Sequence, residues 1–165
     1  MSTLYYAAVS IHLLAALLWL GGMFFLGAVG APVLRSVEPA ALRQQLFQQL
    51  GTRFRSIGWA AIGVLVATGV LILELRGMLR WSGMLGSSEF WATGFGHALA
   101  AKLVAVAAMI VASLVHDFII GPAAGRTVAG SPRSLVLRRR AALLARANAI
   151  VGIIVVLAAV RLARG

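Results

Sequence analysis

The feature that most constrains the fold of this chain is a set of four long apolar stretches, each able to cross a membrane. They run from about 4 to 34, 57 to 75, 95 to 120 and 141 to 162. A helix needs about 20 apolar residues to cross a hydrocarbon core of about 30 Å. Since backbone amides find no water in that core, each stretch is expected to be a helix. The sequence therefore predicts an all-α fold, a transmembrane four-helix bundle in which residues 1–165 form a single domain.

The composition fits a chain that lives in a lipid bilayer. Hydrophobic residues make up 61% of it and its mean hydropathy is +0.96, whereas soluble domains are typically about 45–50% apolar. The absence of cysteine excludes disulfides, thiolate metal ligands and cysteine nucleophiles. No phosphate-binding loop, zinc-protease motif or plausible Ser-His-Asp order is present. A membrane binding or transport protein is thus favoured over an enzyme.

Basic side chains gather in two of the three connections between the apolar stretches. The formal net charge is +11. Most arginines lie in the first and third connections: Arg35, Arg43, Arg53, Arg55, Arg126, Arg133, Arg138, Arg139 and Arg140. The second connection has Arg76 and Arg80, set against Glu74 and Glu89. Because basic loops stay in the cytoplasm, we expect a multi-pass membrane protein whose first and third connections are cytoplasmic and whose termini face outward. The charge is attributed to this orientation, and nucleic acid is not expected as a partner.

The pattern between the first two spans predicts an additional short helix. Residues 38–50 are amphipathic. Their apolar side chains fall on one stripe, formed by Leu42, Leu46, Phe47 and Leu50. We expect this helix to lie on the membrane surface. Pro32 and the Gly121-Pro122 pair are expected to end the first and third spans, because proline lacks an N–H donor and clashes with the preceding turn.

Three ionisable side chains, His12, His97 and Lys102, lie towards the outer ends of apolar spans. Ionisable groups in a membrane are costly, so each one suggests a function. At about 1.5 Å per residue, His12 and Lys102 reach similar depths, and His97 lies about one turn nearer the surface. We expect these residues to converge near the outer leaflet as a cofactor-binding group.

The residue type alone leaves three roles open for His12. It could be a metal or haem ligand, since neutral imidazole is a common ligand for both. It could relay protons, or it could simply form a hydrogen bond to a neighbouring helix.

Thioether sulfur favours Cu(I), and two methionines lie in the outer connection. Met78 and Met84 flank an aromatic segment, and His97 follows on the same side of the membrane. We therefore take His12, His97, Met78 and Met84 as candidate metal ligands. The six-residue spacing of the two methionines is not that of a tight site.

A second polar group lies at the opposite end of the spans. His116 and Asp117 come near the cytoplasmic end of the third span, and Arg146 lies at comparable depth on the fourth. Pairing Asp117 with Arg146 is the most favourable way to hold both charges where solvent is scarce. We interpret His116, Asp117 and Arg146 as a structural polar cluster.

Several of these residues form a pattern that resembles the CopD-like membrane domain, the copper resistance protein D family. The resemblance covers nearly the whole chain, from "HLLAALLWLGGMFF" to "ARANAIVGIIVVLAAVRLARG". Its more specific marks are His12 with Trp19-Leu20-Gly21-Gly22, Thr68-Gly69, Lys102, and His116-Asp117-Phe118 with Gly121-Pro122. The resemblance implies copper uptake or delivery across the bacterial inner membrane, beside a periplasmic copper-binding partner. With it, the outward-facing termini of this multi-pass protein are expected in the periplasm.

The layout is also similar, more distantly, to HemJ-type haem-binding membrane proteins. That likeness implies a haem b or porphyrin with a redox role, for which His12 is the candidate axial ligand and Lys102 the matching buried lysine. A third hypothesis is an accessory structural subunit of a larger membrane complex, because small-residue faces could dock other helices.

Overall fold

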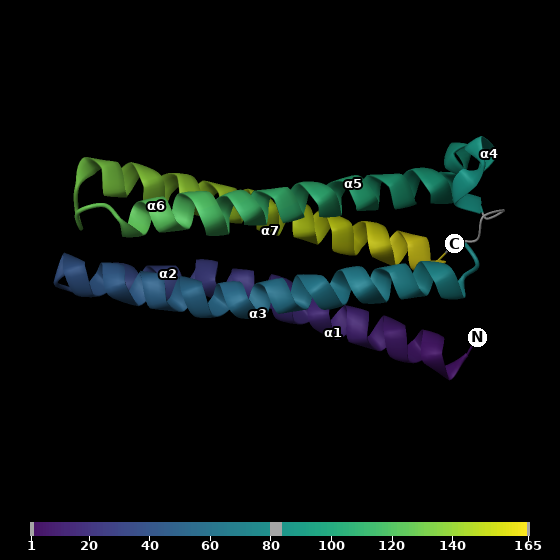
Figure 1. The fold of residues 1–165 in the computed structure, drawn as a ribbon, viewed down its shortest axis with the longest axis horizontal. Helices are drawn as coiled ribbons and strands as arrows, with labels where there is room; N and C mark the ends of the chain where they lie inside the picture. The colour runs from purple at the N-terminus through teal and green to yellow at the C-terminus, as the bar shows by residue number, and fades with distance from the viewer. Residues whose placement is uncertain (1, 80–83, 165) are drawn as a thin grey trace.

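The computed structural model describes residues 2–79 and 84–164, with the side chains of Met84 and of residues 161–164 outside the description. Four long helices dominate it (Figure 1). The first comprises α1 (Thr3–Phe25), a π-helical segment (Leu26–Gly30) and α2 (Ala31–Arg35), and the second is α3 (Ala40–Leu75). The third comprises α5 (Gly94–Leu114), a π-helical segment (Val115–Ile120) and α6 (Gly121–Gly125), and the fourth is α7 (Pro132–Arg164). A 3-10 turn (Met84–Gly86) and the short helix α4 (Ser88–Ala92) precede α5.

The expected all-α membrane bundle is confirmed. Within the described ranges there is no strand, and four helices are long and apolar enough to cross a membrane. The 32 residues of Gly94–Gly125 span about 48 Å, more than a hydrocarbon core of about 30 Å. The long helices therefore extend beyond the core at their ends. Many large apolar side chains, Leu17, Val104 and Ile154 among them, are more than half exposed, as expected for surfaces that face lipid.

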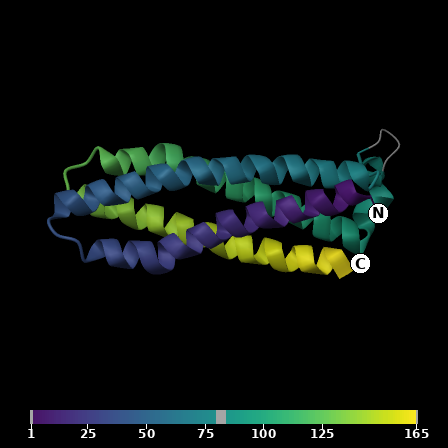
Figure 2. The same cartoon turned by 90° about the horizontal axis from the view of Figure 1, so that it is seen from below.

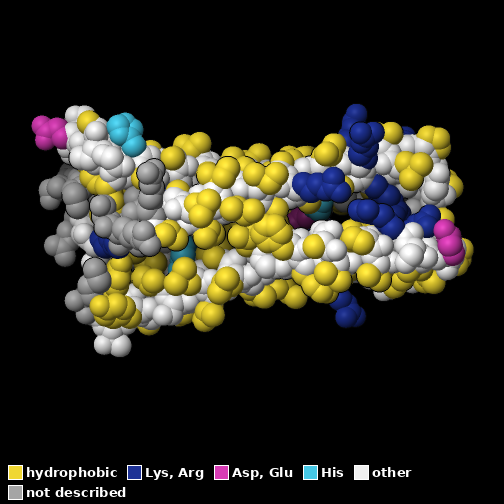
Figure 3. All heavy atoms as spheres, turned by 180° about the vertical axis from the view of Figure 1, so that it is seen from behind, with side chains coloured by type: hydrophobic (Ala, Val, Ile, Leu, Met, Phe, Trp, Pro, Cys, Tyr) yellow, Lys and Arg dark blue, Asp and Glu magenta, His cyan; other side chains and the backbone are white. Residues whose placement is uncertain are grey.

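The helices pair as two antiparallel hairpins. The first long helix packs mainly on α3, and α5 packs mainly on α7. Fewer contacts join the hairpins, between α1 and α7 and between α3 and α6. Figures 1 and 2 show the two chain termini and α4 at one end of the bundle, which we call the terminal end. The opposite end, formed by α2, α6 and the N-terminal turns of α3 and α7, is called the arginine-rich end, and Figure 3 shows most Lys and Arg side chains gathered there.

Both prolines expected to end a span instead lie inside a continuing helix. The first long helix runs past Pro32 to Arg35, and the third runs past Pro122 to Gly125. Each proline follows a π-helical segment, in which an N–H bonds to the carbonyl five residues back, as Gly121 bonds to His116. The wider π-helical turn accommodates proline, which has no N–H donor and whose ring would clash with the carbonyl four residues back in an α-helix. Predicting a helix end at these prolines was wrong.

The separate surface helix was also wrong, because residues 40–50 are the first turns of α3. The helix continues through Gly51, because a single glycine lowers helix stability by only about 1 kcal/mol relative to alanine. Tertiary contacts hold these turns against the second hairpin. Gln44 Nε2 donates to the carbonyls of Gly125 and Thr127, at 3.4 and 3.0 Å. Arg138 donates to Gln44 Oε1 at 3.0 Å. Its guanidinium carbon lies 5.4 Å from the centroid of the Phe47 ring.

Small residues bring the helices together at the centre of the bundle. A Cβ on Gly152 would lie 2.7 Å from Leu20 Cδ1 and 3.2 Å from Met109 Cε, so α7 approaches both α1 and α5 closely there. One turn earlier, buried Asn148 donates from Nδ2 to Ser113 Oγ at 3.1 Å. This hydrogen bond joins α7 to α5 in a region where water cannot supply a partner.

Candidate functional site

The half-buried imidazole of His12 lies against α3. Its Nδ1 is 2.8 Å from Thr68 Oγ1, and the Thr68 hydroxyl donates its proton to the Val64 carbonyl at 2.6 Å. A hydroxyl has one proton to donate, so its oxygen accepts from His12. This arrangement favours the tautomer of neutral His12 that carries its proton on Nδ1. Its other nitrogen, Nε2, carries the lone pair that a metal ion would use.

Thr68 and Gly69 act together on this ring. A Cβ on Gly69 would lie 3.6 Å from His12 Cε1, so the imidazole packs directly over the glycine. Thr68 supplies the acceptor that fixes the tautomer, and Gly69 leaves room for the ring. Sequence reasoning marked the Thr68-Gly69 pair only through a family resemblance and missed its contact with His12. The hydroxyl of Thr68, in the middle of an apolar span, was the sequence signal that could have pointed to a buried hydrogen-bond partner.

Lys102 on α5 approaches this region, whereas His97 does not take part. Lys102 is half-buried, and its charge is within Coulombic reach of both His12 and Arg76. Among the described side chains, no hydrogen bond or ion pair is formed by Lys102. His97 is exposed in the first turns of α5. The expected convergence of His12, His97 and Lys102 into one cofactor-binding group stays a prediction.

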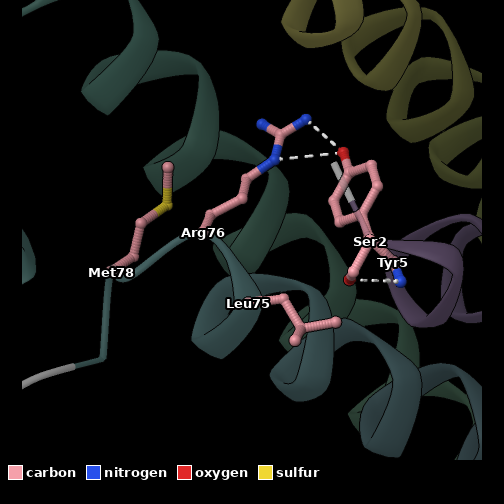
Figure 4. A pocket seen from close by; sticks show the side chains of 5 residues that line it. All are labelled: Ser2, Tyr5, Leu75, Arg76 and Met78. Carbon is pink, nitrogen blue, oxygen red and sulfur yellow. Dashed lines mark hydrogen bonds between the residues drawn. The ribbon is translucent and has the colours of Figure 1, made fainter.

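A pocket of about 330 Å³ opens at the terminal end, lined by Ser2, Tyr5, Leu75, Arg76 and Met78. Figure 4 shows these side chains at the start of α1 and the end of α3. Arg76 donates from Nη2 and Nε to the Tyr5 hydroxyl, at 2.6 and 3.2 Å. Its guanidinium also lies 5.5 Å from the centroid of the Tyr5 ring. The pocket therefore has a positively charged wall that an aromatic ring holds in place.

The candidate metal ligands come from different elements, with His12 on α1, Met78 just after α3 and His97 on α5. Met78 is buried and lines the pocket, while the side chain of Met84 and residue Arg80 lie outside the described part. Over the described residues, no group of three or more His, Asp and Glu side chains could hold a metal ion. A copper ion at His12 would need its other donors from thioethers, water or the molecule that delivers it.

The second polar group forms around Asp117, with partners other than the one expected. Asp117 Oδ1 lies 2.8 Å from His116 Nδ1, and Oδ2 accepts from Trp59 Nε1 at 3.0 Å. The expected ion pair with Arg146 is not formed within the described residues, and Arg146 is exposed. Arg146 and Asn148 lie two residues apart, about 200° around a helix. Since Asn148 takes the buried face, Arg146 faces outward.

Arg55, which precedes the second apolar span in the sequence, completes this group through a backbone contact that the sequence did not suggest. Its Nη1 donates to the backbone carbonyl of Asp117 at 3.1 Å. In the π-helical register this carbonyl would bond to residue 122, which is a proline and has no N–H. Arg55 therefore satisfies an acceptor that Pro122 leaves open. Its guanidinium also lies 5.5 Å from the Phe118 ring centroid.

Comparison with known proteins places these residues in a family. The family model for copper resistance protein D matches residues 48–162, a range that includes Thr68, Lys102 and Asp117 but not His12. An uncharacterized protein of Aquifex aeolicus (strain VF5) is 28% identical over 111 residues, which cover 67% of this chain and 66% of that protein. The match therefore spans just under two thirds of that relative. No solved structure matches the chain. With most of its length matched by the family model, the chain belongs to the copper resistance protein D family.

Proposed function

We propose that this membrane protein takes up or delivers copper, with the Nε2 atom of His12 as a copper ligand. The family assigns it to copper resistance in general terms, and four helices long enough to span a bilayer provide the setting. Imidazole is a suitable copper ligand. The proposal goes beyond these facts by naming His12 Nε2 as the atom that binds copper.

The observation that carries the proposal is the hydrogen bond from His12 Nδ1 to Thr68 Oγ1, at 2.8 Å. Metal-binding histidines usually donate their second nitrogen to a fixed acceptor, which sets the tautomer and the ring orientation. Thr68 supplies such an acceptor because its own proton is used on Val64.

Copper would reach His12 from the terminal end. Tyr5 and His12 are seven residues apart on α1, so they share a face and lie about 10 Å apart along the axis. The pocket lined by Tyr5 and Met78 is therefore about two turns outward of His12. A soft thioether at that level suits a copper ion on its way inward. By the distribution of arginines the terminal end faces the periplasm, where a periplasmic copper-binding protein is the natural donor.

The test is Cu(I) binding to the purified protein in detergent, measured under reducing conditions by competition with a chromophoric chelator. We expect the wild-type protein to retain copper and His12→Ala to lose at least tenfold in affinity. The matched control is His97→Ala, an exposed histidine near the same end, and it should bind copper as the wild type does.

Two results would overturn this proposal. Equal copper affinity in His12→Ala and the wild type would remove His12 as a ligand. A Soret band in protein from haem-replete cells, lost in His12→Ala, would instead assign the imidazole to a haem iron.

A further inference from the structure

The region around the outer pocket is positively charged, which is unexpected for the entrance of a metal cation. Arg76 lines the pocket, and Lys102 lies within Coulombic reach of Arg76 and of His12. The chain has only 4 acidic residues. Two of them, Glu74 and Glu89, belong to this end, and both are exposed. In the part of the chain that the structure describes, neither is in an ion pair with Arg76 or Lys102.

The pocket lies on the same helix seam as His12. On α1, Tyr5 precedes His12 by seven residues, and on α3, Leu75 follows Thr68 by seven. Seven residues return to nearly the same face of a helix, about 10 Å along its axis. Tyr5 and Leu75 line the pocket, while His12 and Thr68 bond to each other below it. A ligand in the pocket therefore lies on the same α1–α3 seam as His12, about two helical turns further out.

The size of the pocket suits a complex rather than a bare ion. A water molecule occupies about 30 Å³ of liquid, and sites for small molecules begin at about 300 Å³. The pocket, at about 330 Å³, has room for a copper ion together with its ligands. Two N–H donors of Arg76 are used on Tyr5, and a guanidinium has five in all, so donors remain for an anion.

Resting on the proposed copper function, we propose that copper reaches His12 as an anionic complex, and that Arg76 and Lys102 are the residues that select it. The two cations bind the negatively charged ligands of the complex and repel an uncomplexed copper cation. Copper then exchanges one of these ligands for His12 Nε2, with no change in its oxidation state. The released anion is retained briefly by the same two cations and leaves to the solvent.

The test compares Cu(I) offered in two forms of opposite charge. The dichloride complex, CuCl₂⁻, is an anion, and the acetonitrile complex is a cation. Loading of detergent-solubilised protein is followed by rapid mixing under anaerobic conditions and quenching with a chromophoric chelator, at matched ionic strength. We expect the wild type to load at least tenfold faster from the anion. Arg76→Gln and Lys102→Gln should remove most of that preference, by slowing loading from the anion and speeding loading from the cation.

Two further variants separate charge from folding. Lys102→Arg keeps the charge and should keep the preference for the anion. Arg53→Gln removes an exposed arginine at the opposite end and should behave as the wild type. A general electrostatic effect of net charge, rather than a local site, would make Arg53→Gln as slow as Arg76→Gln and would overturn the inference.

The outcomes distinguish this inference from the function on which it rests. Equal loading of the wild type from both complexes, abolished in both cases by His12→Ala, would refute the selection of an anion and leave the copper site intact. Failure of the wild type to load from either complex would refute the copper function itself.

Discussion

Thr68 shows how one hydroxyl can determine what a histidine is able to do. His12 could be singled out from sequence because an imidazole in an apolar run is rare and costly. Its partner could not, because Thr68 is 56 residues away and the contact depends on how α1 and α3 are rotated against each other. Arg146 illustrates the same limit, since its depth suggested a contact with Asp117 that its position around α7 prevents. Depth along a helix is readable from sequence, whereas rotation about its axis is set by packing.

Replacing Thr68 by Val should therefore weaken both the fold and the copper site. The change keeps the shape but leaves the Nδ1–H of His12 without its acceptor, which costs about 1–3 kcal/mol when the group is buried. Loss of such an orienting partner typically lowers metal affinity about 10–100-fold. Both effects are measurable, by thermal unfolding in detergent and by chelator competition. Thr68→Ser retains the hydroxyl and should retain the affinity. If Thr68→Val bound copper as tightly as the wild type, the hydrogen bond would have no part in orienting His12.

The π-helical segments show what the pattern of a single helix cannot reveal. Four apolar spans were predictable because only helices satisfy the backbone in lipid. Their continuation past Pro32 and Pro122 was not, and at Pro122 it involves a partner from another helix. Arg55, on α3, donates to the carbonyl of Asp117, which lacks a bond from Pro122. The π-helical segment of the third long helix thus receives a hydrogen bond from a side chain 62 residues earlier in the chain.

A double-mutant cycle tests this pairing of Arg55 with Pro122. Arg55→Ala alone should lower the free energy of unfolding by about 1–3 kcal/mol, because a poorly solvated carbonyl loses its donor. In a Pro122→Ala background the backbone supplies an N–H, so the same arginine change should cost less. We expect a coupling of at least about 0.5 kcal/mol, measured by denaturant unfolding in mixed micelles. Additive effects would show that Arg55 stabilises the bundle by other means, such as its position over Phe118.

At the scale of the whole molecule, the protein is two helical hairpins that meet through a small number of contacts. The sequence indicated the number and order of the helices, because apolar length and arginine placement are one-dimensional signals. It did not indicate the central contact, where Asn148 and Gly152 on α7 meet α5 and α1. His12 belongs to one hairpin and Lys102 to the other. The distance between these two residues, and with it the proposed copper entrance, therefore depends on how the hairpins dock.

Gly152→Val should disturb this docking and, through it, the site. A Cβ at position 152 would lie 2.7 Å from Leu20 Cδ1 and 3.2 Å from Met109 Cε. Leu20 can move a single methyl aside, but the branched side chain of valine needs space on both sides. Overpacking of this kind typically costs about 1–3 kcal/mol, so thermal unfolding in detergent should occur at a lower temperature than in the wild type.

Gly21→Val is the matched control, because a Cβ there meets no atom within 4 Å. A helical glycine replaced in open space should leave the stability unchanged or raise it. The site readout is the loading rate from CuCl₂⁻, which should fall in Gly152→Val and stay constant in Gly21→Val, since only the former moves Lys102 relative to His12. An unfolding temperature for Gly152→Val equal to that of Gly21→Val would mean that the hairpins do not depend on this close approach.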